Sequence, residues 1–363
     1  MKYFDKYTSN TCASSANQHY FTLEKDEVCT GRVFYKIFKG GEFGYSLMFS
    51  NILDSTYANG DISHKNLICN EWTIHSAKVG KCTYISDDIT KYGDISVSDF
   101  KNITFNGSTS KNVMPGEFFC SDELKLSFEK DEFLCLEMTF SGDMLPYHEE
   151  SLLPIYRKTE SGWEYDRKMP LPGMIGCDRP VKEQIGYWGD SITQGIGSTL
   201  NSYLHWNARL SNMLGEEYAY WNIGIGYGRA NDAASGGAWM YKALKCDTLV
   251  VCFGVNDLCR WFSVEETKRD LNTIVDTLKA NGKRVILQTI PPFDYNEERK
   301  AKWIPLNEFI HSELKDKVDL LFDCVPVLGK KDEPHMSIYG GHPNDEGGRV
   351  WAEAMYGEIK DLF

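Results

Sequence analysis

Long apolar runs are missing from this sequence: no stretch approaches the ~20 consecutive apolar residues that a membrane-spanning helix needs. The opening segment, MKYFDKYTSN, has neither an apolar core nor a small-residue cleavage site, so we expect no signal peptide. Internal repeats and low-complexity tracts are also absent. Hydrophobic residues make up 42% and charged residues 25%, which is typical of a globular protein. Because we expect no signal peptide, we expect the protein to be cytoplasmic.

Positive charge is scarce. Lysine and arginine number 39 against 52 aspartates and glutamates, which gives a formal net charge of −13. Binding to nucleic-acid phosphates needs clustered basic residues, and an acidic surface is repelled by anionic membranes. We therefore expect neither a nucleic acid nor a membrane as a partner, whereas a small-molecule or oligosaccharide substrate is compatible with this charge. The sequence leaves open whether the chain forms homo-oligomers.

The 11 cysteines form no C-x-x-C pair and no Cys/His cluster with zinc spacing. Many lie in apolar, strand-like runs, such as Cys252 in LVVCFG. This pattern favours reduced, buried thiols over a disulfide framework or a metal site.

The chain length of 363 residues suits two domains, and the two halves differ in hydrophobic period. Up to about Cys177, short alternating segments such as LKLSF (124–128) and FLCLEMTF (133–140) are separated by turn signals. This pattern predicts an antiparallel β-sandwich for residues 1–177. The proline- and glycine-rich stretch 167–180 is the expected linker.

Residues 178–363 alternate strand-like apolar runs with helix-like runs, which is typical of an α/β fold with a parallel sheet covered on both faces. Ser263, with Glu266 three residues later, predicts a capping box at the start of one helix. The expected strands are 184–189, 218–224, 247–254, 284–290 and about 318–323, and the expected helices are 203–214, 263–280 and 345–363.

Polar residues recur where these predicted strands end, the edge at which such sheets bind ligands. Ser191 follows the first strand in GDSIT, at a tight turn that exposes its hydroxyl and amide beside a helix N-terminus. Gly224 ends the second strand, where glycine lets a backbone N–H approach a ligand. Asn256 follows the third strand with an amide that can donate to an oxyanion. His342, in GHPN before the last helix, can act as a base toward the serine.

Each of these residues alone is better explained by a structural role, as an N-cap, a plain turn, an Asn-Asp cap or a surface histidine. Their joint occurrence at one sheet edge is the stronger observation. The four blocks resemble the GDSL, or SGNH, hydrolase family, whose motifs supply Ser, Gly, Asn and His in this order. The resemblance runs from Gly189 to Asn344, nearly all of the C-terminal domain, and implies a flavodoxin-like, doubly wound sheet.

The resemblance implies a serine esterase that needs no metal or organic cofactor. Ser191 would attack an ester carbonyl, and His342 would take its proton and deliver it to the leaving alcohol. Asp190 and Asp257 would brace the loops. The oxyanion would be held by three donors: the amides of Ser191 and Gly224 and the side chain of Asn256.

One position departs from the family pattern. An Asp usually precedes the catalytic His by three residues, and here that position is Tyr339. Either a backbone carbonyl orients His342 in a Ser-His dyad, or another acid such as Asp332 or Glu333 fills the role. A third alternative makes His335 the base, because Asp332 stands three residues before it. We favour His342, which precedes Pro-Asn and the last helix as in the family.

Short stretches of the N-terminal half, including LMFSN (47–51) and ITFNG (103–107), resemble the accessory, jelly-roll-like sandwich that precedes some bacterial GDSL esterases.

Aromatic residues make up 13% of the chain. Trp261 follows the Asn256 strand end, and Trp303 lies in a stretch after Pro291 and Pro292 that is long for a loop. Both are candidate walls of a substrate site, with plain packing as the alternative.

The leading functional hypothesis is hydrolysis of a short-chain acyl ester, with an O-acetyl group on a carbohydrate as the preferred substrate. The accessory sandwich and the aromatic residues motivate the carbohydrate part. A lipid or thioester acyl hydrolase is the enzymatic alternative. An inactive carbohydrate-binding or scaffold protein is the alternative from another class, and its one support is Tyr339 in place of the acid.

Overall fold

The structure, a computed structural model, describes residues 2–54, 57–58, 62–63, 65–86, 88–93, 95–259, 262–329, 337–338 and 341–363. Its contacts divide the chain into two units, Met1–Asp54 with His64–Val181, and Ser55–Ser63 with Lys182–Phe363. None of the helices within the described ranges combines the length and the apolar character that crossing a membrane requires.

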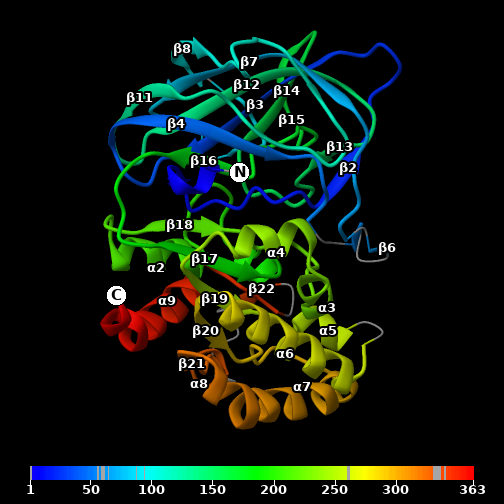
Figure 1. The fold of residues 1–363 in the computed structure, drawn as a ribbon, viewed down its shortest axis with the longest axis vertical. Coiled ribbons are helices and arrows are strands. Elements are labelled where there is room, and N and C mark those ends of the chain that lie inside the picture. Colours follow the sequence, from blue (N-terminus) through cyan, green and yellow to red (C-terminus); the bar gives the residue numbers. More distant parts are fainter. Residues whose placement is uncertain are drawn as a thin grey trace. The chain divides into compact units, whose positions relative to one another are not determined.

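The N-terminal unit is made of antiparallel strands (Figure 1). They are β1 (Thr8–Ser9), β2 (His19–Phe21), β3 (Cys29–Lys36), β4 (Gly41–Ser50), β7 (Trp72–Cys82), β8 (Ser98–Asn102), β9 (Lys111–Val113), β10 (Phe118–Cys120), β11 (Leu124–Phe128), β12 (Phe133–Gly142), β13 (Leu145–Tyr147), β14 (Ile155–Thr159), β15 (Gly162–Tyr165) and β16 (Met174–Cys177). A short helical turn, η1 (Lys2–Asp5), precedes them.

These strands form two main sheets. One has the order β1-β16-β4-β10, with β11 also paired to β4, and the other has the order β15-β14-β3-β12-β7-β8, with β9 also paired to β7. Both contribute to one apolar core, in which Val33 and Tyr35 of β3 join Leu47 and Phe49 of β4. The predicted antiparallel architecture of this half is confirmed, and β11 coincides with the alternating segment 124–128.

The C-terminal unit is built on a parallel sheet with the order β18-β17-β19-β20-β21. Its strands are β17 (Gln184–Gly189), β18 (Ala219–Asn222), β19 (Thr248–Cys252), β20 (Arg284–Gln288) and β21 (Leu320–Phe322). This is the strand order 2-1-3-4-5 of flavodoxin-like, doubly wound folds, so the predicted SGNH hydrolase fold is confirmed. The order reverses between β17 and β19, and ligands bind such sheets outside the carboxyl ends of these two strands.

Helices cover both faces of this sheet. They are α1 (Ser191–Gln194), α2 (Trp206–Leu214), α3 (Ala230–Ala234), α4 (Gly237–Ala243), α5 (Val255–Cys259), α6 (Val264–Ala280), α7 (Glu297–Phe309), α8 (Val325–Leu328) and α9 (Asp345–Ile359). Shorter elements of the same unit are β5 (Tyr57–Ala58), β6 (Ile62–Ser63), β22 (Ser337–Ile338), β23 (His342–Pro343), η2 (Ile310–Leu314), η3 (Lys315–Lys317) and η5 (Lys360–Leu362).

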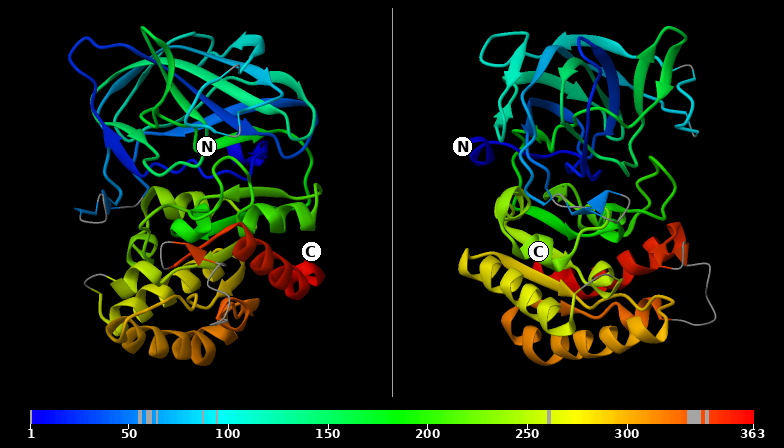
Figure 2. Two further views of the ribbon diagram at one scale, coloured as in Figure 1. Left: turned by 180° about the vertical axis from the view of Figure 1, so that it is seen from behind. Right: turned by 90° about the vertical axis from the view of Figure 1, so that its right-hand side faces the viewer.

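Aromatic contacts show which helix covers which face. The ring of Tyr187 on β17 meets Trp206 of α2 at a centroid distance of 5.5 Å, and the next residue, Trp188, meets Trp239 of α4 at 5.8 Å. Since successive strand residues point to opposite faces, α2 and α4 lie on opposite sides of the sheet. Helix α9 packs beside α2 (Figure 2), where Trp206 and Trp351 stack at 5.3 Å.

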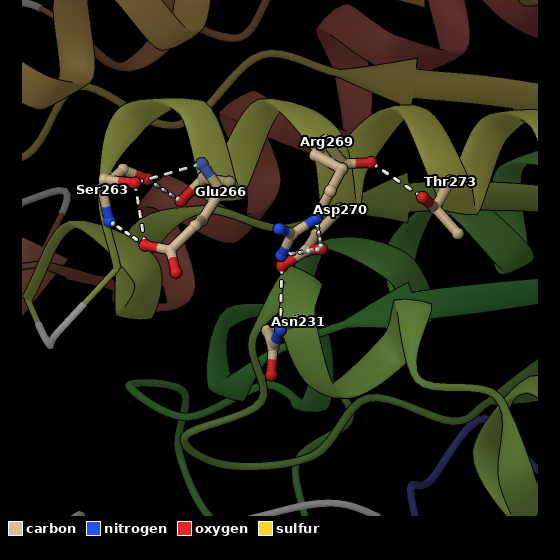
Figure 3. Close-up of polar contacts among 7 residues, drawn as sticks. Asn231, Ser263, Glu266, Arg269, Asp270 and Thr273 are labelled. Atoms are coloured by element: carbon tan, nitrogen blue, oxygen red, sulfur yellow. Dashed lines mark hydrogen bonds and ion pairs between the residues drawn. The ribbon is translucent and has the colours of Figure 1, made fainter.

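The start of α6 carries the predicted capping box (Figure 3). The Ser263 hydroxyl accepts from Glu266 N at 3.2 Å, and the Glu266 carboxylate accepts from Ser263 N at 2.9 Å. Further along the same helix, Asp270 accepts from the side chain of Asn231 at 2.9 Å and so ties α6 to α3. The Asn231–Asp270 bond thus helps to hold α3 against α6.

Candidate active site

Ser191 is the first residue of α1, in the turn that follows β17. The Asp190 side chain is the N-cap of this short helix and accepts from Ile192 N at 2.9 Å. Gly195 caps the C-terminal end of the helix, and its φ of 113° is the left-handed conformation that glycine adopts easily. A helix leaves its first amides without intrahelical partners, so the Ser191 N–H is placed to donate to a bound oxyanion.

Ser191 and His342 are 151 residues apart in sequence and lie in direct contact. The Ser191 Oγ is 2.9 Å from His342 Nε2. This is hydrogen-bond distance for a hydroxyl and an imidazole nitrogen, and it is the geometry that a serine nucleophile and its base require.

The end of β18 holds α1 from one side. The side chain of Asn222 donates to Thr193 O at 3.0 Å and accepts from Gly224 N at 3.0 Å. Asn207 of α2 also donates to Thr193 O. These buried amides hold the end of the nucleophile helix to the second strand and to α2.

His342 comes from a segment near the C-terminal end of the chain. It lies on β23, paired with Ile338 of β22, and is followed by Asn344, whose side chain caps α9 by accepting from Gly347 N at 2.9 Å. A Cβ added to Gly197 would lie 2.9 Å from His342 Cβ and 2.4 Å from Pro343 O, so the loop after α1 packs directly on the histidine segment.

The same loop is tied to the start of α9. Asp345 accepts from the amide of Thr199 at 2.9 Å and from its hydroxyl at 2.6 Å. Asp345 stands three residues after His342, so this exposed pair helps to fix the position of the histidine relative to the serine loop.

Burial lowers the pKa of His342 below its usual value of 6.5. The imidazole is therefore neutral at physiological pH. A neutral imidazole can accept the proton of Ser191, as a general base must.

The other two predicted oxyanion donors have protein acceptors in this structure. Gly224 N donates to Asn222 Oδ1, and the backbone of Gly224 packs so closely on α1 that an added Cβ would lie 2.4 Å from Gln194 N. Asn256, on α5, donates from Nδ2 to Gly228 O at 3.0 Å. An amide NH₂ carries two donors, so Asn256 retains one N–H for a ligand.

Four residues named from the sequence lie outside the described residues: Asp332, Glu333, His335 and Tyr339. The alternative base and the candidate orienting acids are therefore not placed. Trp261 also lies outside the described residues.

Trp303 lies on α7, where the sequence suggested a long loop. Asn296 caps this helix by accepting from Arg299 N at 2.9 Å. The half-buried Trp303 indole donates to Ile290 O at 2.8 Å, just beyond the end of β20. Sequence reasoning missed Phe293, whose ring lies 3.1 Å from where a Cβ on Gly341 would be, and is thus next to His342.

Among the residues that the structure describes, no group of three or more His, Cys, Asp or Glu is arranged to hold a metal ion. The groups gathered at the sheet edge are a hydroxyl, an imidazole and amide donors. Such a set can carry out nucleophilic acyl transfer.

The model of the GDSL-like lipase/acylhydrolase family matches residues 187–350, which contain both Ser191 and His342. The C-terminal half of this chain is a GDSL-like lipase/acylhydrolase domain. The prediction from the four sequence blocks, a hydrolase of the GDSL family, is thus confirmed for this domain. No curated protein matches the sequence.

Solved structures similar to the GDSL domain include the acetylxylan esterase Axe2 from Geobacillus stearothermophilus, at 19% identity and a TM-score of 0.43, covering 50% of this chain and 95% of that one. A putative lipolytic protein of the G-D-S-L family from Desulfitobacterium hafniense DCB-2 has 20% identity and a TM-score of 0.41, with 50% and 99% covered. The psychrotrophic esterase EstA from Pseudoalteromonas sp. has 19% identity and a TM-score of 0.40, with 49% and 97% covered.

Proposed function

We propose that the GDSL domain hydrolyses short-chain acyl esters, with O-acetyl groups on a carbohydrate as its substrate class. The observation that carries the proposal is the 2.9 Å contact between Ser191 Oγ and His342 Nε2. The serine follows β17, at the point where the strand order of the sheet reverses and where such folds bind ligands.

The reaction follows from these two groups. Ser191 Oγ attacks the ester carbonyl carbon while His342 Nε2 takes its proton, which gives a tetrahedral oxyanion and an imidazolium. The C–O bond to the alcohol then breaks, and the imidazolium returns the proton to the leaving oxygen. In the second half, His342 takes a proton from water, the hydroxide attacks the acyl-enzyme, and Ser191 leaves with the proton.

The developing oxyanion is stabilised by the Ser191 amide and by the remaining N–H of Asn256. These donors lie at the ends of β17 and β19, the two neighbouring strands at the point of reversal. The Gly224 amide can contribute as a third donor only by sharing or releasing its bond to Asn222.

The preference for a small acyl group is supported by crowding beside His342. Gly197 packs on the His342 segment, and the Phe293 ring stands against the neighbouring Gly341. We assign Phe293 as one wall of the substrate site. The antiparallel N-terminal unit and the aromatic content of the chain support a carbohydrate as the alcohol part of the ester.

The experiment is hydrolysis of p-nitrophenyl esters from acetate to octanoate by the wild type, Ser191→Ala and the control Ser198→Ala, which changes a serine of the neighbouring loop. The proposal expects the highest rate on acetate, a decline with chain length, and loss of activity only in Ser191→Ala. Acetylated sugars would then be tested. A rate that rises toward octanoate would favour the lipid or thioester alternative, and equal rates in wild type and Ser191→Ala would contradict the proposal.

A further inference from the structure

A groove of about 360 Å³ lies between strands β8 and β11 of the N-terminal unit (Figure 1). Among the described strands, β8 pairs only with β7 and β11 pairs only with β4, so each is an edge strand of a different sheet. All residues that line the groove belong to this unit. The volume falls within the range of roughly 300–1,000 Å³ that is typical of small-molecule sites.

The buried part of the lining is apolar. Leu126 and Phe128 of β11 have exposed fractions of 5% and 2%, and Gly80 of β7 is also buried. Phe100 of β8 is half-buried and lines the groove as well. Lys78 Nζ lies 4.3 Å from the centroid of the Phe100 ring, a contact that helps to fix the orientation of the ring.

A β-bulge shapes the β8 side of the groove. The pairing of β7 with β8 shifts by one residue, so that Asp99 and Phe100 both stand opposite Gly80. Asp99 has a φ of 53°, in the left-handed region that residues other than glycine rarely adopt. A Cβ on Gly80 would lie 2.8 Å from Ser98 O, so this close approach of the strands requires glycine. Such bulges redirect side chains and recur beside functional sites.

Charged side chains of both signs line the rest of the groove: Glu42, Lys81, Asp99, Lys101 and Lys125. Within the described ranges of the chain, none of these five forms an ion pair. By contrast Lys78, on the same strand as Lys81, pairs with Glu137 at 2.9 Å. Lys101 donates to Lys125 O at 2.9 Å and so links β8 to β11, and its ammonium group keeps further N–H donors. Carboxylate and ammonium groups are therefore both available to a ligand.

This combination of groups matches the chemistry of a sugar. Each sugar hydroxyl both donates and accepts hydrogen bonds, so one molecule can bond to carboxylates and to ammonium groups together. The C–H face of a pyranose ring is apolar and suits the Phe100 ring and the buried lining. A polyanion suits the groove less, because Glu42 and Asp99 would repel its negative charges.

We propose that this groove binds a neutral oligosaccharide, with a pyranose ring against Phe100 and its hydroxyls bonded to the surrounding carboxylate and ammonium groups. The N-terminal unit then holds a carbohydrate through a site of its own. The inference goes beyond the proposed esterase function and does not rest on it, because binding in this groove requires no ester.

Calorimetric titration of the full chain with xylohexaose, cellohexaose and mannohexaose tests the proposal. At least one of these neutral probes should bind the wild type. Phe100→Leu keeps an apolar side chain but removes the ring, and it should weaken this binding by about 10-fold. Tyr84→Leu is the matched control, since Tyr84 is an aromatic residue of the same unit that is 61% exposed and lies outside the groove, and it should bind like the wild type.

A second variant tests the charged groups without touching the core. Glu42 and Lys125 are both exposed, so the double change Glu42→Ala/Lys125→Ala should leave the fold intact and weaken binding by about 10-fold. Lys158→Ala, at an exposed lysine outside the groove, should have no effect. Affinity for the neutral probe should be the same at about 0.05 M and 0.5 M salt, because no ion pair forms between protein and ligand.

Hexagalacturonate, which has a carboxylate on every ring, tests whether the groove prefers an anion, and it should bind more weakly than the neutral probe. The proposal is overturned if none of the three neutral probes binds, or if hexagalacturonate binds at least as tightly. It is also overturned if both groove variants bind like the wild type. None of these probes contains an ester, so failure of the esterase proposal would appear only in the p-nitrophenyl ester assay.

Discussion

The two members of the catalytic pair are held in different ways. Ser191 lies on a helix that buried side chains hold at both ends. Asp190 caps its start, and Asn222 and Asn207 donate to Thr193 O near its end. His342 lies on a short strand, held through the exposed Thr199–Asp345 contact and the α9 cap. Changes around the serine should therefore affect both stability and activity, whereas changes around the histidine should affect mainly activity.

The largest effect should come from the proposed oxyanion donor Asn256. Asn256→Ala should lower kcat by roughly 10²–10³, because one preorganised donor is lost. The free energy of unfolding should change little, since Asn256 is only half-buried and its side chain makes one hydrogen bond within the described part of the chain, to Gly228 O. Steady-state kinetics on p-nitrophenyl acetate and urea unfolding would measure the two effects. An unchanged kcat would remove Asn256 from the oxyanion site.

Asn222→Ala tests how buried hydrogen bonds hold the serine helix. This change removes two buried hydrogen bonds, the one from Asn222 to Thr193 O, which keeps its bond from Asn207, and the one from Gly224 N to Asn222, so the free energy of unfolding should fall by about 1–3 kcal/mol. We expect kcat to fall by about 10-fold as α1 loosens. Loss of stability without loss of kcat would mean that the hydrogen bonds of Asn222 do not position the serine.

Asp345→Ala tests how the exposed contact with Thr199 holds the histidine segment, and Glu346→Ala is the control on the same helix turn. Removing Asp345 frees the Thr199 loop from α9, and kcat should fall by about 10-fold. The free energy of unfolding should fall by less than about 1 kcal/mol, because the pair is exposed. A stability loss as large as that of Asn222→Ala would mean that the histidine and the serine are held in the same way.

The smallest effect is on pH dependence. Burial lowers the pKa of His342 below 6.5, so the acid limb of kcat/KM should lie below pH 6.5. By the same shift, the histidine contributes stability that is present above pH 6.5 and is lost as the pH falls toward its folded pKa. An acid limb at or above pH 6.5 would mean that a nearby negative charge outweighs burial at this histidine.

The sequence predicted the parts of the site that depend on a strong local pattern. The apolar run 184–189 became β17 with the same bounds, and the capping box at Ser263 was found where the spacing placed it. The order of the motifs indicated that Ser191 and His342 would meet, because parallel strands and the segments after them share one edge.

Other parts depended on partners that are distant in sequence. Pro291 and Pro292 suggested a long loop, whereas a helix begins six residues after Pro291, at Glu297, behind the Asn296 cap. Asn222 looked like an ordinary strand end, since nothing local shows that it bonds to Thr193. Asp190 and Asp257 looked like caps and braces, because only the three-dimensional structure shows that both are buried and that one oxygen of each has no hydrogen-bond donor among the described residues.

Covalent labelling tests most directly whether Ser191 is a nucleophile that His342 activates. The wild type, Ser191→Ala and His342→Asn would be incubated with an ethyl p-nitrophenyl phosphonate, followed by intact-mass measurement and peptide mapping. We predict one phosphonyl group on Ser191 in the wild type, none in Ser191→Ala, and labelling slowed by roughly 10²-fold or more in His342→Asn. An adduct on another residue, or equal labelling rates in wild type and His342→Asn, would contradict this prediction.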